Sequence, residues 1–485
     1  MDEAQPILAA PGHTPDVTTG SSGIDGQAPV EAPQPDPISS LRSRRMLTYF
    51  GPAFVASVAY IDPGNFSTNI SAGTEFGYRL LWVLLWSNAM AILVQYLSAK
   101  LGIVTGLTLP QNCRKHFPRP VTLGLWVAAE VAAVATDLAE FLGAALGLYL
   151  LFGPALLAHN FSPKEALFAA ALVSTVLVFG ILALDLAGHL WLERGIIGMV
   201  GIIGLCYGFE VFLIHPDWHR AMLDTLIPRL DLSSHKYFHD SIFAAVGMLG
   251  ATVMPHVIYL HSALVQPRLK EMTGSITPAR ARIHQQGSPS ISPHRPKLHR
   301  AILSRFIRYE LVDVFVAMNG AWLINSAMIL MAAVAFGHAR DLTPSIEDAY
   351  RTLGPLFGHS AAIIFAVALL CSGLSSSTVG VMAGQVIIEG FLDVKFPIYL
   401  RRLITIVPAL VVIGTGFEPL RILNLSQVVL SFTLPFALIP LLILTSRVSV
   451  MESFASALRM RVSGWLVVSV ITVLNAILLL QLAFD

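Results

Sequence analysis

A carboxylate, two helix-breaking residues and a carboxamide stand together in one apolar stretch, at Asp62-Pro63-Gly64-Asn65. The surrounding stretch, about 46–70, is long enough to cross a bilayer, where an ionisable side chain is costly unless it pairs, lines a cavity or carries function. Proline removes a backbone donor and glycine tolerates almost any backbone angle, so the two residues together unwind a helix. The carbonyl groups freed at such a break, with the oxygens of Asp62 and Asn65, can bind a cation.

A second candidate break, Met254-Pro255-His256, lies in a later apolar stretch. Ala251, three residues before Met254, can offer a backbone carbonyl, and Met254 itself a thioether. Mg²⁺ and Ca²⁺ prefer oxygen ligands, whereas a soft thioether favours ions such as Mn²⁺, Fe²⁺ or Co²⁺. Methionine in a membrane helix is commonly apolar filling, but its place at a break that matches the first favours a ligand. We therefore predict a mixed oxygen and sulfur site for a transition metal.

Three carboxylates form a second cluster. Glu130, Asp137 and Glu140 fall within an arc of about 80° on one face of a helix. Such a stripe can relay protons, because burial and neighbouring charges change how readily each carboxylate holds a proton. It can also form a fixed salt-bridge network with Arg401 and Arg402, and the two roles are compatible.

Three other polar residues in apolar stretches each have two possible roles. His256 and His261 follow the second break and can serve a proton route or packing alone. Gln427 can reach the central site in some conformations, or make an ordinary hydrogen bond between helices.

Enzymatic motifs are missing from the sequence. It has no Walker A motif, no Gly-x-Gly-x-x-Gly before a helix and no His-Glu-x-x-His pair. The run Ser375-Ser376-Ser377 has no base in view, which favours close helix packing. The three cysteines are scattered and indicate no disulfide framework. We predict that the protein is not an enzyme and has no cofactor.

Composition identifies the surroundings of these residues. The 485 residues are 55% hydrophobic and only 13% charged, which indicates a polytopic membrane protein whose main partner is the lipid bilayer. A net charge of +1 gives no indication of nucleic-acid binding, and nothing implies an obligate protein partner. At roughly 20 residues per spanning helix, we expect eleven spans. They lie near 46–72, 80–104, 121–152, 166–187, 194–215, 238–266, 310–337, 359–391, 401–417, 421–446 and 463–483.

Basic residues predict the orientation. If the amino terminus is inside, most of the 31 lysine and arginine residues fall on cytoplasmic segments, as expected for membrane proteins. An odd number of spans then places the carboxyl terminus outside. The tail at 1–41 is rich in Pro, Gly and Ser and is predicted to be disordered, and the polar loop at about 269–300 to be a flexible cytoplasmic linker.

The two breaks also predict an internal repeat. They lie in the first and sixth spans, so five spans separate them, and an odd number gives the second half opposite topology. Matching interrupted helices in inverted halves indicate a transporter with its site at the membrane midplane. We expect a first repeat at 46–217, a second at 238–446, and an additional span at 463–483.

Three motifs, in this order and on these spans, resemble the Nramp (MntH/DMT) family of proton-coupled divalent-metal transporters. They are Asp62-Pro63-Gly64-Asn65, the run ATDLAEF at 135–141, and Met254-Pro255-His256. The likeness covers about 46–483. It implies an all-α LeuT-like fold of two inverted five-helix repeats plus an eleventh helix, in a multi-pass protein of the cell membrane that imports Mn²⁺ or Fe²⁺ with H⁺.

The resemblance also implies roles for individual residues. Metal ligands would be Asp62, Asn65 and Met254, with the backbone carbonyls of Ala59 and Ala251 in particular conformations, and Gln427 would bind the metal or support a ligand. The implied proton route consists of Asp62, Asp137, Glu130, Glu140, His256, Arg401 and Arg402.

The chain departs from the family pattern at two points. Val257 stands where many members have Asn, and the 269–300 loop is expanded. The resemblance implies that magnesium-transporting relatives replace this methionine, so Met254 argues against that branch. A LeuT-fold transporter of another solute such as amino acids is the alternative, although an anionic Asp62 opposes an anionic substrate. A channel or receptor would need no proton coupling.

Overall fold

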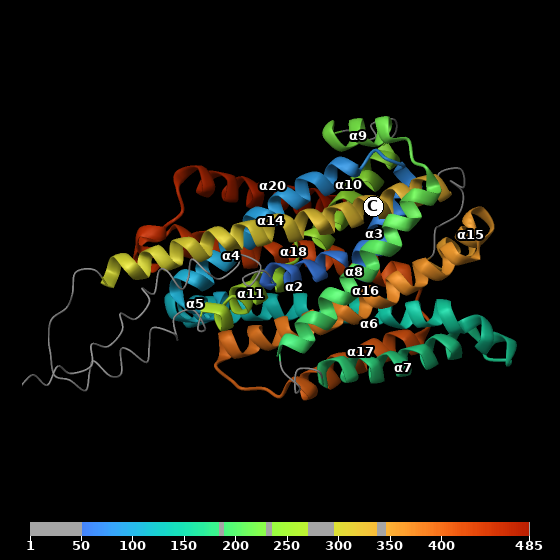
Figure 1. The fold of residues 1–485 in the computed structure, drawn as a ribbon, viewed down its shortest axis with the longest axis horizontal. Helices are drawn as coiled ribbons and strands as arrows, with labels where there is room; N and C mark the ends of the chain where they lie inside the picture. The colour runs from blue at the N-terminus through green and yellow to red at the C-terminus, as the bar shows by residue number, and fades with distance from the viewer. Residues whose placement is uncertain (1–50, 184–188, 229–234, 270–294, 337–345, 485) are drawn as a thin grey trace, which may run out of the picture. The chain divides into compact units, whose positions relative to one another are not determined.

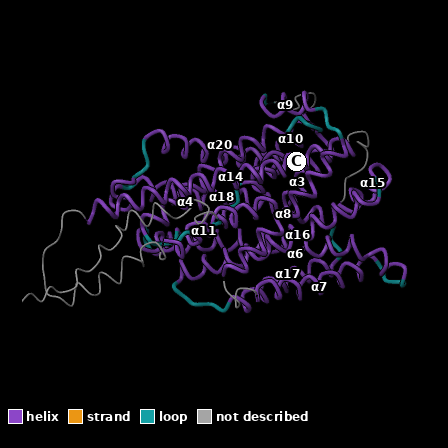
Figure 2. Tube along the Cα trace, in the orientation of Figure 1, coloured by secondary structure: helices purple, strands orange, loops and turns teal. Residues whose placement is uncertain are grey.

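A computed structural model describes residues 51–183, 189–228, 235–269, 295–336 and 346–484. Within these ranges the regular structure is helical, without strands (Figure 2). The predicted all-α class is therefore confirmed. The predicted tail at 1–41 and most of the predicted linker at 269–300 lie outside the described residues.

Ten helical segments in the described part of the chain are long and apolar enough to cross a membrane. They are α4 (Leu81–Thr105), α6 (Arg119–Ala158), α7 (Pro163–Ala183), α8 (His189–Ile214), α10 (His235–Thr252) continued by α11 (Pro255–Leu264), α14 (Arg295–Phe336), α16 (His359–Leu392), α17 (Ile398–Thr415), α18 (Pro419–Ser446) and α20 (Leu458–Phe484). The predicted first span is made of shorter pieces, α2 (Pro52–Val58), the 3₁₀ turn η2 (Ala59–Ile61) and α3 (Pro63–Phe76).

Several described elements differ from the predicted segments. The short helices α5 (Leu109–His116), α9 (Trp218–Leu226), α15 (Ile346–Phe357) and α19 (Val448–Met451), with the turn η4 (Glu452–Phe454), connect the long helices and lack an apolar run of spanning length. Helix α14 begins at Arg295, earlier than the predicted start at 310. Its first turns contain charged residues such as Arg300, Arg305 and Arg308, which hydropathy excludes from an apolar span.

The long helices expose apolar side chains outward, as lipid contact requires. Leu205 on α8 is 77% exposed and Val176 on α7 is 71% exposed. A soluble protein rarely exposes so many large apolar groups together. The structure thus supports a multi-pass membrane protein.

Close helix contacts hold the broken first span in place. Helix α16 packs along α6, and α14 packs against α3 and α4 (Figure 1). At the α6–α16 contact, a Cβ added to Gly373 would lie 2.3 Å from the backbone nitrogen of Ala144. One residue earlier on α6, a Cβ added to Gly143 would lie 2.0 Å from the ring of Pro63. Small residues on α6 and α16 therefore let the break at Pro63 lie directly against α6.

Candidate functional site

The first break has a local cause. Asp62 is extended (φ −83°, ψ 169°) and is the N-cap of α3, which begins at Pro63. Its Oδ1 accepts hydrogen bonds from the backbone N of Asn65 at 2.8 Å and from Asn65 Nδ2 at 2.7 Å. Proline is favourable at the first position of a helix because no partner exists there for a backbone N–H. The sequence therefore ends one helix and starts another at Asp62, as predicted.

Two carbonyl groups freed by this break are capped by side chains from distant helices. The carbonyl of Tyr60 accepts a hydrogen bond from Asn325 Nδ2 of α14 at 2.7 Å. That of Ile61 accepts one from Ser372 Oγ of α16 at 2.5 Å. Ala59, whose carbonyl the family resemblance assigns to the metal, lies fully buried at the start of η2. Sequence reasoning missed Asn325 and Ser372.

The second break repeats the first. Helix α10 ends at Thr252, Met254 is extended (φ −84°, ψ 122°), and α11 begins with Pro255. Asn65 Nδ2 donates a hydrogen bond to the carbonyl oxygen of Ala251 at 2.9 Å. This bond joins the two breaks, which lie 186 residues apart in the chain. The structure thus brings together Asp62, Asn65 and the Ala251–Met254 segment.

Gln427 of α18 lies at the same place. A Cβ added to Gly64 would lie 1.8 Å from Gln427 Nε2, and one added to Gly250 of α10 would lie 2.2 Å from the Gln427 carbonyl oxygen. Its side-chain nitrogen donates to Ser426 Oγ, 3.2 Å away on its own helix. Gln427 therefore lies close to residues beside both breaks, and its part as a ligand stays a prediction.

The buried oxygens at this centre lack donors. Among the described residues, Asp62 Oδ2, Asn65 Oδ1 and Gln427 Oε1 have no hydrogen-bond partner, and all three residues and Met254 are fully buried. Buried acceptors without partners are rare because each one costs free energy. A bound cation would satisfy all three.

The donor set contains one acidic residue. The described residues hold no group of three or more His, Cys, Asp or Glu side chains that could bind a metal ion. The candidate ligands are one carboxylate, two amide oxygens, a thioether and backbone carbonyls. With a single negative charge, this set fits an ion that is bound reversibly.

The predicted carboxylate stripe lies against the predicted arginines. Arg401 Nη1 is 2.8 Å from Glu130 Oε1, and Arg402 Nη1 is 3.5 Å from Asp137 Oδ1. Arg402 also donates to Ser377 Oγ, so the serine run has a polar contact in addition to its packing. Both charge pairs of the predicted network are thus present, and both the fixed-network and the proton-relay interpretations stay predictions.

Glu140 and His256 connect this stripe with the breaks. Glu140 is fully buried, its oxygens have no hydrogen-bond partner among the described residues, and it interacts electrostatically with both Asp137 and Asp62. His256 Nδ1 lies 3.1 Å from Thr136 Oγ1 on α6. The predicted part of both residues in a proton route stays a prediction.

A further buried polar chain was not predicted. His261 lies 2.9 Å from Gln95 Oε1 and, through Nε2, 2.9 Å from Glu310 Oε1, and Gln95 Nε2 donates to the Tyr60 hydroxyl at 2.6 Å. His261 is thus more than a packing residue. The criterion that singled out Asp62, a polar side chain in an apolar stretch, also applies to Gln95 and Glu310, which lie within or beside predicted spans.

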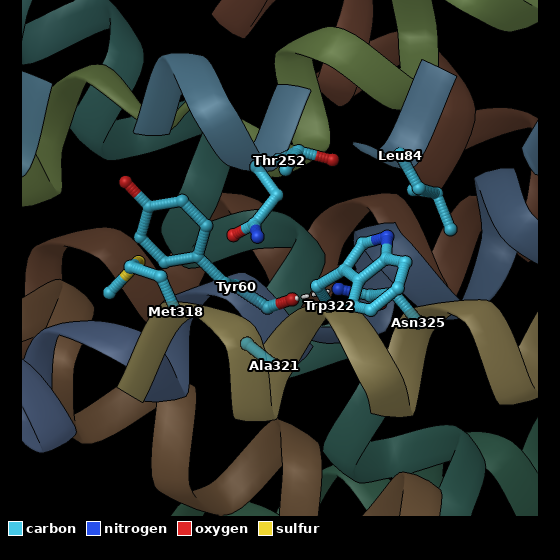
Figure 3. Close-up of a pocket in the computed structure, with 8 residues that line it drawn as sticks. Tyr60, Leu84, Thr252, Met318, Ala321, Trp322 and Asn325 are labelled. Carbon is cyan, nitrogen blue, oxygen red and sulfur yellow. Dashed lines mark hydrogen bonds between the residues drawn. The ribbon is translucent and has the colours of Figure 1, made fainter. Parts of the chain in front are cut away.

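A small cavity lies beside both breaks, between α4, α10 and α14 (Figure 3). Its polar lining comes from Tyr60, Asn88, Thr252 and Asn325, and the dashed line in the figure marks the bond from Asn325 to the Tyr60 carbonyl. It has room for about one water molecule. None of Asp62, Asn65, Met254 and Gln427 lines this cavity.

Known proteins match this chain over most of its length. The family model described as "Nramp: Natural resistance-associated macrophage protein-like" matches residues 53–481. A divalent metal cation transporter MntH from Caldanaerobacter subterraneus is 45% identical over 436 residues, which is 90% of this chain and 93% of that protein.

Solved structures agree. A crystal structure of the manganese transporter of Eremococcus coleocola matches with a TM-score of 0.74 and 30% identity, covering 89% of this chain and 86% of that one. The nucleobase-cation-symport transporter Mhp1 matches with a TM-score of 0.52 at 13% identity, covering 89% of this chain and 91% of that one. At that identity the likeness concerns the fold alone, and it confirms the predicted LeuT-like architecture.

Proposed function

Because this chain belongs to the Nramp family, we propose that it is a secondary transporter that imports divalent transition-metal ions, Mn²⁺ and Fe²⁺ among them, together with protons. Its relatives are transporters and not enzymes. The observation that carries the proposal is the set of three buried oxygens without donors, on Asp62, Asn65 and Gln427, at the junction of two broken helices.

Each residue of the centre then has a definite part. Asp62 supplies the negative charge, Asn65 and Gln427 supply neutral oxygens, and Met254 supplies the sulfur that favours a transition metal over Ca²⁺. The side-chain nitrogen of Asn65 now donates hydrogen bonds to Asp62 Oδ1 and to the Ala251 carbonyl oxygen. To present its oxygen to the ion, the Asn65 amide must rotate. The carbonyls of Ala251 and Ala59 contribute as the breaks rearrange.

Protons leave the centre by a separate route. In this proposal Asp62 accepts a proton, which passes by His256, Glu140 and Asp137 toward Glu130. The contacts of His256 with Thr136, of Asp137 with Arg402 and of Glu130 with Arg401 support it. The electrostatic link between Asp62 and Glu140 supports this order. The positive charges of Arg401 and Arg402 stabilise the buried carboxylates of the stripe and change their proton affinity.

Transport proceeds by alternating access around the two breaks, with the two predicted repeats rocking against each other. We place the protein in the cell membrane, with the amino terminus in the cytoplasm and the carboxyl terminus outside, from the distribution of Lys and Arg. This orientation puts α9 on the outer side.

Uptake of radiolabelled Mn²⁺ into proteoliposomes tests the function. We expect saturable uptake that rises severalfold when the outside is made acidic relative to the inside, and that falls when a protonophore collapses the gradient. Liposomes without protein provide the blank, and an unlabelled amino-acid mixture should not compete. Absence of saturable uptake would disprove the proposal.

A further inference from the structure

One buried carboxylate lies apart from the site described above. Glu210 on α8 is 1% exposed, although it lies in the last turns before the helix ends at Ile214. Within the described ranges, neither of its side-chain oxygens has a hydrogen-bond partner, and no Lys, Arg or His forms an ion pair with it. Glu140, the comparable acid on α6, at least interacts with Arg402.

The surroundings of Glu210 are apolar or weakly polar. Cys206 and Tyr207 lie one turn earlier on α8, and Cys371 of α16 interacts with Cys206. Around them, 52–58 of α2, 317–336 of α14 and 360–374 of α16 contain no charged residue. The helix α14, which packs against α8, also carries the acids Glu310 and Asp313. Both have partners elsewhere, because Glu310 lies 2.9 Å from His261 and Asp313 accepts a hydrogen bond from the backbone N of Gly51. Glu75 at the end of α3 interacts with Asp240 on α10.

Glu210 is connected to the cation site through packing. The ring of Tyr207 packs edge-on against Phe66, with centroids 5.4 Å apart, and Phe66 follows Asn65 in α3. Tyr207 in turn interacts with Glu210, one turn later on α8. A movement of α3 relative to α8 would therefore change the packing one turn away from Glu210.

Physical chemistry decides the state of this side chain. An ionised carboxylate buried without a partner is far less favourable than a neutral acid in the same place. Once the helices part and water enters, the ionised form becomes favourable again. Covering Glu210 is thus linked to the uptake of a proton, and uncovering it to proton release.

We propose that Glu210 is a positioning residue that must take up a proton before the end of the bundle carrying α9 closes over the cation site. The proposal rests on the proposed transport function and orientation, which place that end outside. Glu210 touches neither the ion nor its ligands. Its protonation makes closure of the outer side dependent on external pH. This dependence is separate from the proposed proton route through Asp137.

Uptake of Mn²⁺ at fixed internal pH and clamped membrane potential tests this link. Glu210→Gln imitates the neutral acid, so we expect uptake equal to the parent near pH 5.5 outside and severalfold higher than the parent near pH 8, since a single linked proton changes the closed fraction by up to about tenfold per pH unit. Glu210→Asp should keep the pH dependence of the parent. The matched control is Asp224→Asn on α9, whose carboxylate already has Arg220 at 3.8 Å.

A structural role alone predicts a different result, namely uptake that is reduced equally at every pH. That result, or a Glu210→Gln profile identical to the parent profile, would overturn the inference while leaving the proposed function intact. Absence of uptake by the parent would overturn the proposed function instead.

Hydrogen–deuterium exchange of α8 without metal gives a readout independent of transport. After correction for intrinsic exchange, protection of residues 205–214 in the parent should fall as pH rises, and in Glu210→Gln it should stay high. Protection in the parent that does not depend on pH would overturn the inference whether or not the protein transports metal.

Discussion

Met254 is the residue on which the choice of ion depends. It offers the sulfur at the second break and is fully buried there. We expect Met254→Ala to weaken Mn²⁺ binding on the order of tenfold, because a soft ligand is lost, and to let Ca²⁺ compete where it does not in the parent. Calorimetric titration with each ion measures both effects.

The matched control is Met248→Ala, which removes another buried methionine from α10 without touching the break. It should change stability but not the ratio of Mn²⁺ to Ca²⁺ affinity. If Met254→Ala rejects Ca²⁺ as well as the parent does, the sulfur has no role in selectivity.

Asp137 separates proton movement from metal binding. It lies on α6, 3.5 Å from Arg402, with no contact to the three donor oxygens at the breaks. We expect Asp137→Asn to lower metal-driven proton entry by more than about tenfold while Mn²⁺ affinity changes by less than about threefold, as for a proton-transfer group outside the binding site. A pH-sensitive dye inside the liposomes reports proton entry. Equal losses of both quantities would show that the two routes are one.

At the scale of helices, the sequence predicts what is determined locally. Both breaks follow from Pro63 and Pro255, each placed directly after an extended residue, and apolar periodicity places the spans within a few residues. The capping of the freed carbonyls could not be predicted in this way, because Asn325 and Ser372 come from 265 and 311 residues away. An asparagine or a serine in an apolar helix has many possible partners, and only the packed structure selects one.

The contact between α6 and α16 gives a prediction at this scale. A Cβ at Gly373 would lie 2.3 Å from the Ala144 backbone, which cannot move as a flexible side chain can. We expect Gly373→Ala to destabilise the protein by about 1–3 kcal/mol through overpacking, and to weaken Mn²⁺ binding because α16 also carries Ser372. Thermal unfolding in detergent measures the first effect.

Gly320→Ala on α14 is the control, since nothing lies within 4 Å of a Cβ added there. It should leave the melting temperature unchanged or raise it slightly, because alanine favours helices more than glycine does. Equal melting temperatures for the two variants would mean that α6 and α16 are not tightly packed at Gly373.

At the scale of the whole molecule, the cation site lies between helices from both predicted repeats. One hydrogen bond, from Asn65 to Ala251, joins the two breaks directly, and Gln427 contacts both. That the repeat at 238–446 is inverted relative to the repeat at 46–217 stays a prediction, based on the odd number of spans between the two breaks. A cation bound here contacts α3, α10 and α18 at once, so binding should stabilise the assembly as a unit.

Thermal unfolding with and without metal tests this. At a free Mn²⁺ concentration of 100 times the dissociation constant, binding to the folded state alone adds about 2.7 kcal/mol of stability and raises the melting temperature. Mg²⁺ at the same concentration should have little effect, because a thioether is a poor ligand for it. Asp62→Asn should abolish the Mn²⁺ effect, whereas Glu75→Gln, which neutralises an exposed acid on the same helix, should retain it. A Mn²⁺ shift that survives in Asp62→Asn would place the ion elsewhere in the molecule, because no other carboxylate belongs to the donor set at the two breaks.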